Sequence, residues 1–350
     1  MIGDQISHLY RFKKLRQEVS TDYLGVKRYI DDMREGRKHV GLHTLAVDYP
    51  KPYTILASYL SRRIGVPDEP RIAACTVTEQ IIKPIMLADD FLDENWDGIQ
   101  KQTLDWSSNV RFDDTELDKT NFEYLRLLPL FNNINGIMLL DEHERLGIAK
   151  PGSADALNKM NDQVADKVLK SYSWQLEHRI KKREGILNKK DFPSVDELIE
   201  TYVSGIAGAP FSLVPEIVSY YTEDPRAKEI VPLMYYFGEI FQIPDDTADI
   251  HEDIIRLQMT TAISAILNHG TKSERELLYS LSTTPVGDGS QYVYKKFPSL
   301  KALEPRMSES RLRLKEGLVK LGLTEVVKDF EIFDENYEQI RRMINSSINR

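Results

Sequence analysis

The sequence predicts an all-α protein, a single large helical bundle that spans residues 1–350 as one domain. Leu, Ile and Met recur three or four residues apart through most of the chain, which is the period of an amphipathic helix. Strand-like alternation is sparse, and runs of β-branched residues are short. No internal repeat of roughly 20–50 residues stands out, so a repeat architecture is not expected.

The helical pattern is divided by turn-forming residues. The periodic segments are, in chain order, 72–93, 122–146, 154–187, 195–221, 226–250, 253–268, 309–322 and 324–347. Stop signals separate several of them: Val66-Pro67-Asp68, Pro151-Gly152-Ser153, Glu223-Asp224-Pro225 and Asn268-His269-Gly270. Ser153 and Asp155 suit the cap of a helix that opens after Pro151. Residues 283–299 have the composition of a loop, but neither this loop nor the Pro151 region gives a reason to divide the domain.

Composition narrows the class of protein. With 350 residues, 41% of them hydrophobic, the chain can bury a sizeable core. The single cysteine, Cys75, cannot form an internal disulfide, so an oxidising compartment is not indicated. The net charge of −9 argues against nucleic acid as a partner, because phosphate backbones require a basic surface. Neither a signal peptide nor a membrane-spanning run is visible, so we expect a cytoplasmic protein without stable membrane insertion.

Several catalytic signatures are absent. No histidine stands three residues after a glutamate, which removes the Glu-x-x-His pairs of di-iron bundles. No His-Asp dipeptide occurs, which removes the usual metal ligands of helical phosphohydrolases. A P-loop is missing, and Cys75 lacks a nearby histidine that would indicate a thiol nucleophile.

Two clusters of aspartates each follow an apolar helical run. The clusters are Asp89-Asp90-Phe91-Leu92-Asp93, followed by Glu94 and Asp97, and Asp245-Asp246-Thr247-Ala248-Asp249, followed by Glu252 and Asp253. On a helix, the four-residue spacing places three carboxylates of each cluster on one face. Pro84 and Pro244 stand shortly before the clusters, where each would either kink its helix and aim carboxylates into a cavity or mark a sharp helix start.

Such an arrangement is costly unless it binds cations. Like charges four residues apart on a helix repel by about 0.2–0.5 kcal/mol per exposed pair. The cost rises where carboxylates also lose water. Mg²⁺ prefers octahedral oxygen ligands and is usually held by one or two carboxylates together with water and substrate phosphates. A single DDxxD could be an ordinary solvated helix face, but two of them favour several Mg²⁺ ions around a diphosphate.

The second cluster completes a longer pattern. Residues Gly238-Glu239-Ile240-Phe241-Gln242-Ile243-Pro244-Asp245-Asp246-Thr247-Ala248-Asp249 match G-x-x-F-Q-x-x-D-D-x-x-D in full. With the DDxxD at Asp89–Asp93, the chain resembles the class I isoprenoid synthase superfamily, and most closely the trans-isoprenyl (polyprenyl) diphosphate synthases. The likeness covers residues 40–270. It implies an isoprenoid synthase fold around a central apolar cavity, three Mg²⁺ ions and a homodimer.

The resemblance also implies roles for the aspartates. Asp89, Asp90 and Asp93 would ligate one or two Mg²⁺ ions, and Asp245, supported by Asp249, would ligate another. Asp246 is counted with the catalytic residues because, together with Gln242, it would orient water or diphosphate.

Further residues are expected to bind substrate. Gln175 lies where the family often has a mid-chain glutamine, Glu79 also fits the family pattern, and Phe241 belongs to the second motif. One to two turns before Asp89, the side chains of Ile82, Ile85 and Met86 would line the pocket for the prenyl tail or else form plain core.

The chain departs from the family around the second diphosphate. Gly98 and Ile99 replace a pair of arginines after the first motif, and the Gly-Gly-Lys-Arg stretch is reduced to Tyr49-Pro50-Lys51-Pro52. Arg256 is the only cation near the second motif. Most of the missing groups hold isopentenyl diphosphate in the family, so Lys51 and Arg256 are the remaining candidates for that role.

Three functions are compatible with these residues. The first is a Mg²⁺-dependent prenyltransferase that ionises an allylic prenyl diphosphate and transfers the cation to isopentenyl diphosphate, which Phe241-Gln242 favours. The second is a terpene cyclase, or prenyl transfer to a different acceptor. It is favoured by the missing cations and by Gly205–Pro210, which we expect to break a helix. The third, a catalytically silent helical subunit, is disfavoured by two complete aspartate motifs. We adopt the first and keep the second as the alternative.

Overall fold

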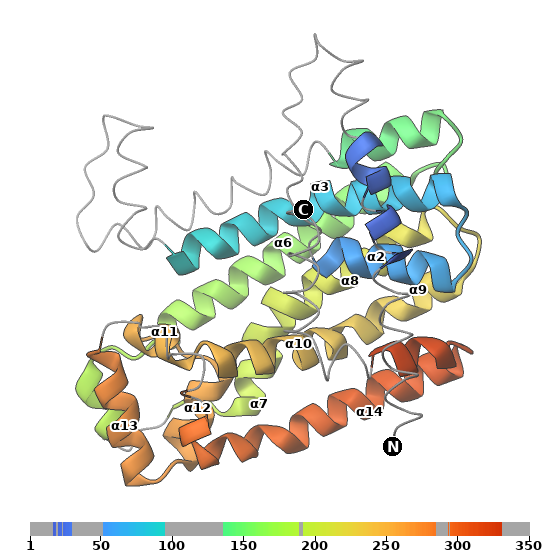
Figure 1. The fold of residues 1–350 in the computed structure, drawn as a ribbon. Helices are drawn as coiled ribbons and strands as arrows, with labels where there is room; N and C mark the ends of the chain where they lie inside the picture. Colours follow the sequence, from blue (N-terminus) through green and yellow to red (C-terminus); the bar gives the residue numbers. More distant parts are fainter. Residues whose placement is uncertain are drawn as a thin grey trace, which may run out of the picture. The chain divides into compact units, whose positions relative to one another are not determined.

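The computed structural model describes residues 17–29 without 19 and 23, then 52–94, 136–188, 192–284, 293 and 295–330, with the side chains of 83–94 and of Leu176 left out. Throughout these ranges the regular elements are helices and no strand occurs, which confirms the all-α prediction (Figure 1). In the same ranges, no helix combines the length and the apolar character that a bilayer crossing requires.

The helices follow one another in chain order. The α-helices are α2 (Pro52–Arg63), α3 (Asp68–Glu94), α6 (Ser153–His178), α7 (Val195–Leu198), α8 (Ala209–Ser219), α9 (Arg226–Ile230), α10 (Met234–Ala248), α11 (Ile250–Ile255), α12 (Thr261–His269), α13 (Lys272–Ser282) and α14 (Glu304–Lys320). A further helix covers residues 136–145. Short 3-10 helices are η1 (Arg183–Leu187), η3 (Val231–Leu233) and η5 (Pro298–Leu303), and η2 (Ile199–Gly208) is a π-helix.

The periodic segments of the sequence are mostly helical where the structure describes them, whereas residues 122–135 and 331–347 lie outside the described ranges. One difference is instructive. The segment predicted over 253–268 is divided between α11 and α12. The backbone of Leu257 adopts φ 57°, in the left-handed region, which ends the first of the two helices. The Leu257 carbonyl accepts a hydrogen bond from the amide of Ile180 at 3.0 Å. A contact with a residue far away in the sequence therefore holds this break.

The chain forms two compact units. The first comprises Met1–Ala165, Leu213–Val231 and Leu323–Arg350, and the second comprises Asp166–Ser212 and Pro232–Gly322. The boundaries fall inside α6, α8 and η3 and shortly after α14, and none of them falls at the Pro151 turn or within residues 283–299. The single-domain organisation stays a prediction.

In the first unit, α2 packs along α3, and buried polar groups tie further segments to this pair (Figure 1). Asp22 is 2% exposed and accepts hydrogen bonds from Ser58, Arg62 and Arg71. A second polar group surrounds His143, whose ring is hydrogen-bonded to the hydroxyls of Tyr29 and Tyr221 at 2.7 and 2.6 Å. Because buried polar groups are costly unless they are paired, both clusters favour one particular packing.

The second unit is organised around α10, which packs against η2, α12 and α14 (Figure 1). Glu239 joins α10 to α14, because its buried carboxylate accepts two hydrogen bonds from the guanidinium of Arg306, at 3.1 and 2.9 Å, and another from the hydroxyl of Ser310. Phe211 of α8 meets the rings of Phe237 and Phe241 edge to face. These contacts fix the helix that carries the second aspartate motif.

The prediction that Gly205–Pro210 breaks a helix is wrong. The chain stays helical from α7 through η2 into α8, and only the hydrogen-bonding pattern changes. The amide of Ala209 donates to the carbonyl of Ser204, five residues back, as in a π-helix. Pro210, which lacks an amide donor, is the second residue of α8 and directly follows this π-helical hydrogen bond.

Replacing Gly238 with alanine is expected to destabilise the protein. A Cβ at Gly238 would lie 2.6 Å from the backbone nitrogen and 2.7 Å from the Cα of Gly208, so the two helices would have to separate. Overpacking of this kind costs about 1–3 kcal/mol or more. The midpoint of urea unfolding would measure the loss. Gly185→Ala is the control, because its new Cβ would have Ile180 at an ordinary 3.8 Å. Equal midpoints for the two variants would contradict the expectation.

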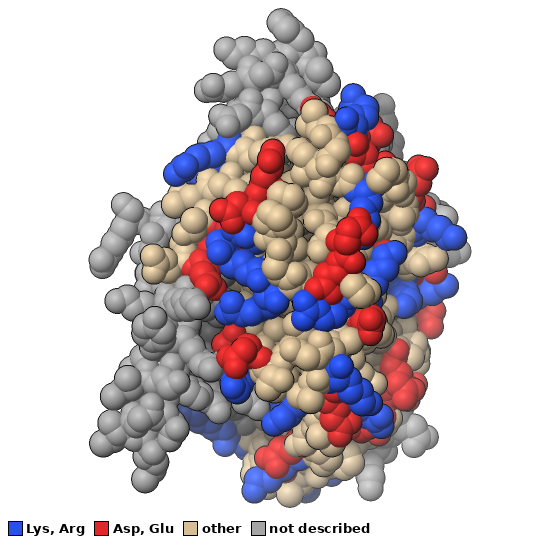
Figure 2. Space-filling model, turned by 90° about the vertical axis from the view of Figure 1, so that its right-hand side faces the viewer, with Lys and Arg blue, Asp and Glu red and all other residues tan. Residues whose placement is uncertain are grey.

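Charged side chains are intermixed at the surface. On the face drawn in Figure 2, acidic and basic groups of the described residues alternate instead of gathering into a patch of one sign. Ion pairs at helical spacing also occur among the described residues, such as Lys170–Asp166 at 2.6 Å and Arg145–Asp141 at 3.3 Å. Exposed pairs of this kind add little to stability.

Candidate active site

The second aspartate motif occupies the last turns of α10 and the junction with α11. Asp245 and Asp246 lie in α10, and Asp249, with φ −98° and ψ 9°, is the residue between the two helices. Pro244 lies inside α10 and does not start it. The helix bends away at Asp249, and Asp253 is buried whereas Asp249 is exposed. Of the three carboxylates that the sequence placed on one helix face, only those of Asp245 and Asp249 therefore share a face in this structure.

The two adjacent aspartates have different surroundings. Asp246 is 3% exposed, and its Oδ2 accepts hydrogen bonds from the backbone amide of Thr261 at 2.8 Å and from the Thr261 hydroxyl at 2.6 Å. Its Oδ1 accepts from Nε2 of Gln242 at 2.8 Å. Asp245 is partly exposed and Asp249 is exposed. Asp245 and Asp249 thus reach the surface, whereas Asp246 is buried among protein donors.

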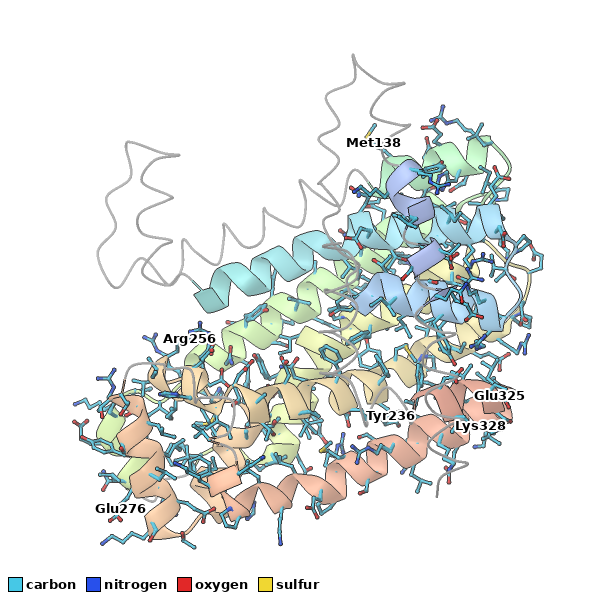
Figure 3. All side chains as sticks on the ribbon, in the orientation of Figure 1. Met138, Tyr236, Arg256, Glu276, Glu325 and Lys328 are labelled. Carbon is cyan, nitrogen blue, oxygen red and sulfur yellow. The ribbon has the colours of Figure 1, made fainter. Side chains whose placement is uncertain are left out.

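The electrostatics at this end of α10 favour a cation. The carbonyl end of a helix carries partial negative charge, so carboxylates there are unfavourably placed. No basic residue lies in the last turn of α10. Arg256, at the end of α11, lies 4.0 Å from Glu252 and is exposed (Figure 3). Asp245 and Asp249 are hard oxygen donors, which is the ligand type that Mg²⁺ prefers.

The first aspartate motif lies in a similar position on its own helix. Asp89, Asp90 and Asp93 belong to the last two turns of α3, so their backbones have the helical spacing that the sequence predicted. As in α10, the last turn of α3 contains no basic residue. The orientation of these side chains lies outside the description, as does Asp97. The first motif belongs to the first unit and the second motif to the second unit. That the two motifs face each other therefore stays a prediction.

The described side chains do not complete a metal centre by themselves. Where side chains are described, no three of His, Cys, Asp and Glu gather closely enough to hold a metal ion. A site at Asp245 and Asp249 would therefore need ligands from elsewhere, such as the first motif, water or a diphosphate. The donor chemistry fits Mg²⁺, because this ion is commonly held by one or two carboxylates together with water and phosphate.

The remaining predicted residues have varied surroundings. Ile82 on α3 is 1% exposed, which is compatible both with a pocket wall and with plain core. The side chains of Ile85 and Met86 lie outside the description. Gln175 on α6 is buried, and its Nε2 has no hydrogen-bond partner among the described residues. Lys51 lies outside the described residues. A buried amide without a partner is costly, so Gln175 is a candidate for binding water or a ligand.

Other predicted groups have protein partners. The buried carboxylate of Glu79 accepts a hydrogen bond from the hydroxyl of Thr54. Phe241 contacts Phe211 through the edge of its ring, at a centroid distance of 5.2 Å. Burial raises the pKa of the Cys75 thiol well above its usual range, which agrees with the prediction that this cysteine is not a nucleophile.

Thr261 and Glu239 are functional candidates that the sequence pattern alone did not identify. Thr261 stands fifteen residues after Asp246, which it contacts through two donors. Glu239 stands at a variable position of the second motif, and its partners lie on α14. Both contacts join helices that are separate in the sequence, so no spacing rule marks them.

Comparison with solved structures shows that the chain has the fold of polyprenyl synthases of known structure, as the resemblance of its two motifs implied. A polyprenyl synthase from Roseobacter denitrificans is similar with a TM-score of 0.56 at 13% identity, over 95% of this chain and 98% of that one. A decaprenyl diphosphate synthase from Rhodobacter capsulatus has a TM-score of 0.57 at 13% identity, over 95% and 99%. A polyprenyl synthase from Caulobacter crescentus, solved with calcium and isoprenyl diphosphate, has a TM-score of 0.56 at 15% identity, over 88% and 92%.

The likeness is one of structure and not of overall sequence. No family model matches the chain, and no curated protein matches it by sequence. At identities of 13–15%, the similarity establishes the fold alone.

Proposed function

We propose that this protein is a Mg²⁺-dependent class I prenyltransferase that ionises an allylic prenyl diphosphate and joins the prenyl group to isopentenyl diphosphate. The observation that carries the proposal is the complete second motif, Gly238–Asp249, on α10 of a fold shared with polyprenyl synthases. The Caulobacter crescentus enzyme binds a divalent cation and an isoprenyl diphosphate on the same fold, which supports this substrate class.

The residues of the chain have distinct tasks in this proposal. Asp89, Asp90 and Asp93 on α3, together with Asp245 on α10 and Asp249 directly after it, would hold the cations that bind the diphosphate. When bound, the Mg²⁺ ions neutralise charge on the departing diphosphate. The allylic carbon then becomes cationic as its C–O bond breaks, and the π-electrons of the acceptor alkene form the new C–C bond. A proton is lost from the acceptor in the last step.

Apolar residues before the first motif are assigned to the tail of the substrate. Ile82, Ile85 and Met86 precede Asp89 by one to two helical turns, so they are suited to line the wall below the diphosphate. An apolar wall excludes the water that would otherwise capture the cation. Gln175 and Phe241 complete the proposed substrate site. By the same likeness we propose a homodimer.

Incubating the purified protein with Mg²⁺ and a C10, C15 or C20 allylic diphosphate, with and without isopentenyl diphosphate, tests the proposal. We expect longer prenyl diphosphates only when isopentenyl diphosphate is present, detected by mass spectrometry. Hydrocarbons or alcohols formed without it would instead indicate a cyclase. Absence of turnover with every pair, in a protein that is folded by circular dichroism, would contradict both activities. The Mg²⁺ requirement is checked by adding EDTA.

A further inference from the structure

The buried carboxylate of Asp246 connects two helices of the second unit. Thr261 is the first residue of α12, and Thr260 at the N-cap makes no side-chain cap hydrogen bond. Asp246 Oδ2 takes over that role, because it accepts from both the amide and the hydroxyl of Thr261. A carboxylate at the amino end of a helix is favourable, since that end carries partial positive charge.

The same carboxylate determines how the Gln242 amide is turned. Nε2 of Gln242 donates to Oδ1 of Asp246 at 2.8 Å. The opposite orientation would bring the amide oxygen against a carboxylate oxygen, and neither atom can donate. Oε1 of Gln242 therefore lies at the edge of the amide that faces away from Asp246.

Gln242 shares a face of α10 with the proposed metal ligands. It precedes Asp245 by three residues and Asp249 by seven, the spacing of neighbours along one side of a helix. Gln242 is partly exposed, as is Asp245. An amide oxygen at this position is a further hard acceptor beside two carboxylates, able to accept from a cation or from water bound to one.

We propose that Asp246 is a positioning residue, which acts through Gln242. Anchored by Thr261, it fixes the Gln242 amide with its oxygen, and not its NH₂ group, on the face of Asp245 and Asp249. This assignment rests on the proposed function, and it gives the two adjacent aspartates separate roles: Asp245 binds the cation, and Asp246 orients a neighbouring acceptor.

Three variants test the orientation: Asp246→Asn, Gln242→Glu and the double variant. In Asp246→Asn, the one amide oxygen stays on Thr261, so the new NH₂ group faces Gln242 and forces its amide to turn over. We expect turnover to fall about 10–100-fold, the usual effect of losing a group that orients a metal ligand, and the Mg²⁺ concentration for half-maximal rate to rise. Gln242→Glu places a second carboxylate against that of Asp246. Because the two charges repel and neither group can donate, we expect the thermal unfolding midpoint to fall.

The double variant is the decisive one. The new asparagine NH₂ can donate to the new glutamate, whose second oxygen again faces Asp245 and Asp249. We expect both the midpoint and the turnover to recover relative to the worse single variant. Asp166→Asn is the control, because it removes an exposed carboxylate from a comparable pair with Lys170 and should change neither quantity.

The two readouts separate this inference from the proposed function. If the wild-type protein shows no turnover, the proposed function fails, and the unfolding midpoints still report whether Asp246 and Gln242 are coupled. Unimpaired turnover in Asp246→Asn would overturn the inference. So would a double variant that recovers neither midpoint nor turnover, or one that recovers its midpoint without recovering turnover.

Discussion

Replacing Asp245 with alanine is expected to lower turnover of the allylic diphosphate by about 10²–10³-fold or more, because the charge on the departing diphosphate would lose its stabilisation. The thermal unfolding midpoint should stay equal or rise. Asp245 stands in the last turn of α10, a turn that contains no basic residue. Removing a carboxylate from the negative end of a helix relieves repulsion. Turnover with saturating Mg²⁺ and differential scanning calorimetry measure the two effects.

Asp89→Ala on α3 is the companion variant, since the first motif has the same place at the end of its helix. Asp141→Ala is the control, because it removes an exposed aspartate that is paired only at the surface with Arg145. A large fall in the unfolding midpoint of Asp245→Ala would mean that this carboxylate is structural. Unchanged turnover in both motif variants would contradict a metal-binding role.

The sequence predicted the helices well because their positions depend on a local pattern. The apolar periodicity of 72–93 corresponds to α3, and the second motif falls at the end of α10. The break at Leu257 and the π-helix η2 were not predictable in this way. Leu257 is held by the amide of Ile180, and the absence of a side chain at Gly205 leaves room for Ser171 and Lys167 of α6. Both features depend on contacts between distant segments.

The candidate site was predictable to a similar extent. Spacing identified Asp245 and Asp249 as carboxylates on one face of a helix, because helical geometry alone fixes that relation. The family resemblance already gave Asp246 a role different from theirs, but spacing could not show what anchors it, since its donors come partly from Thr261 on another helix. The facing of the two aspartate motifs depends on the packing of the whole chain and stays a prediction.

Asp22→Ala is expected to have the largest effect on stability. Asp22 is 2% exposed and pairs with Arg62 at 2.5 Å and with Arg71 at 3.0 Å. The Arg71 side chain is itself only 7% exposed, and without Asp22 its one remaining ion pair among the described residues would be that with the exposed Asp68, at 2.7 Å. Breaking a buried pair on one side typically costs about 3–5 kcal/mol.

The free energy of unfolding in urea would measure this loss, with Asp141→Ala again as the control for an exposed ion pair in the same unit. The control should lose less than about 1 kcal/mol.

Asp22→Asn separates charge from shape, because it keeps the size of the side chain and can still accept from Ser58 while neutralising the carboxylate. We expect it to lose most of what Asp22→Ala loses, since the largely buried charge of Arg71 would then be paired only with the exposed Asp68. A loss in Asp22→Ala no larger than that of the control would show that the ion pair with Asp68 is enough to compensate Arg71. The anchoring of residues 17–29 to α2 and α3 would then not depend on the ion pairs of Asp22.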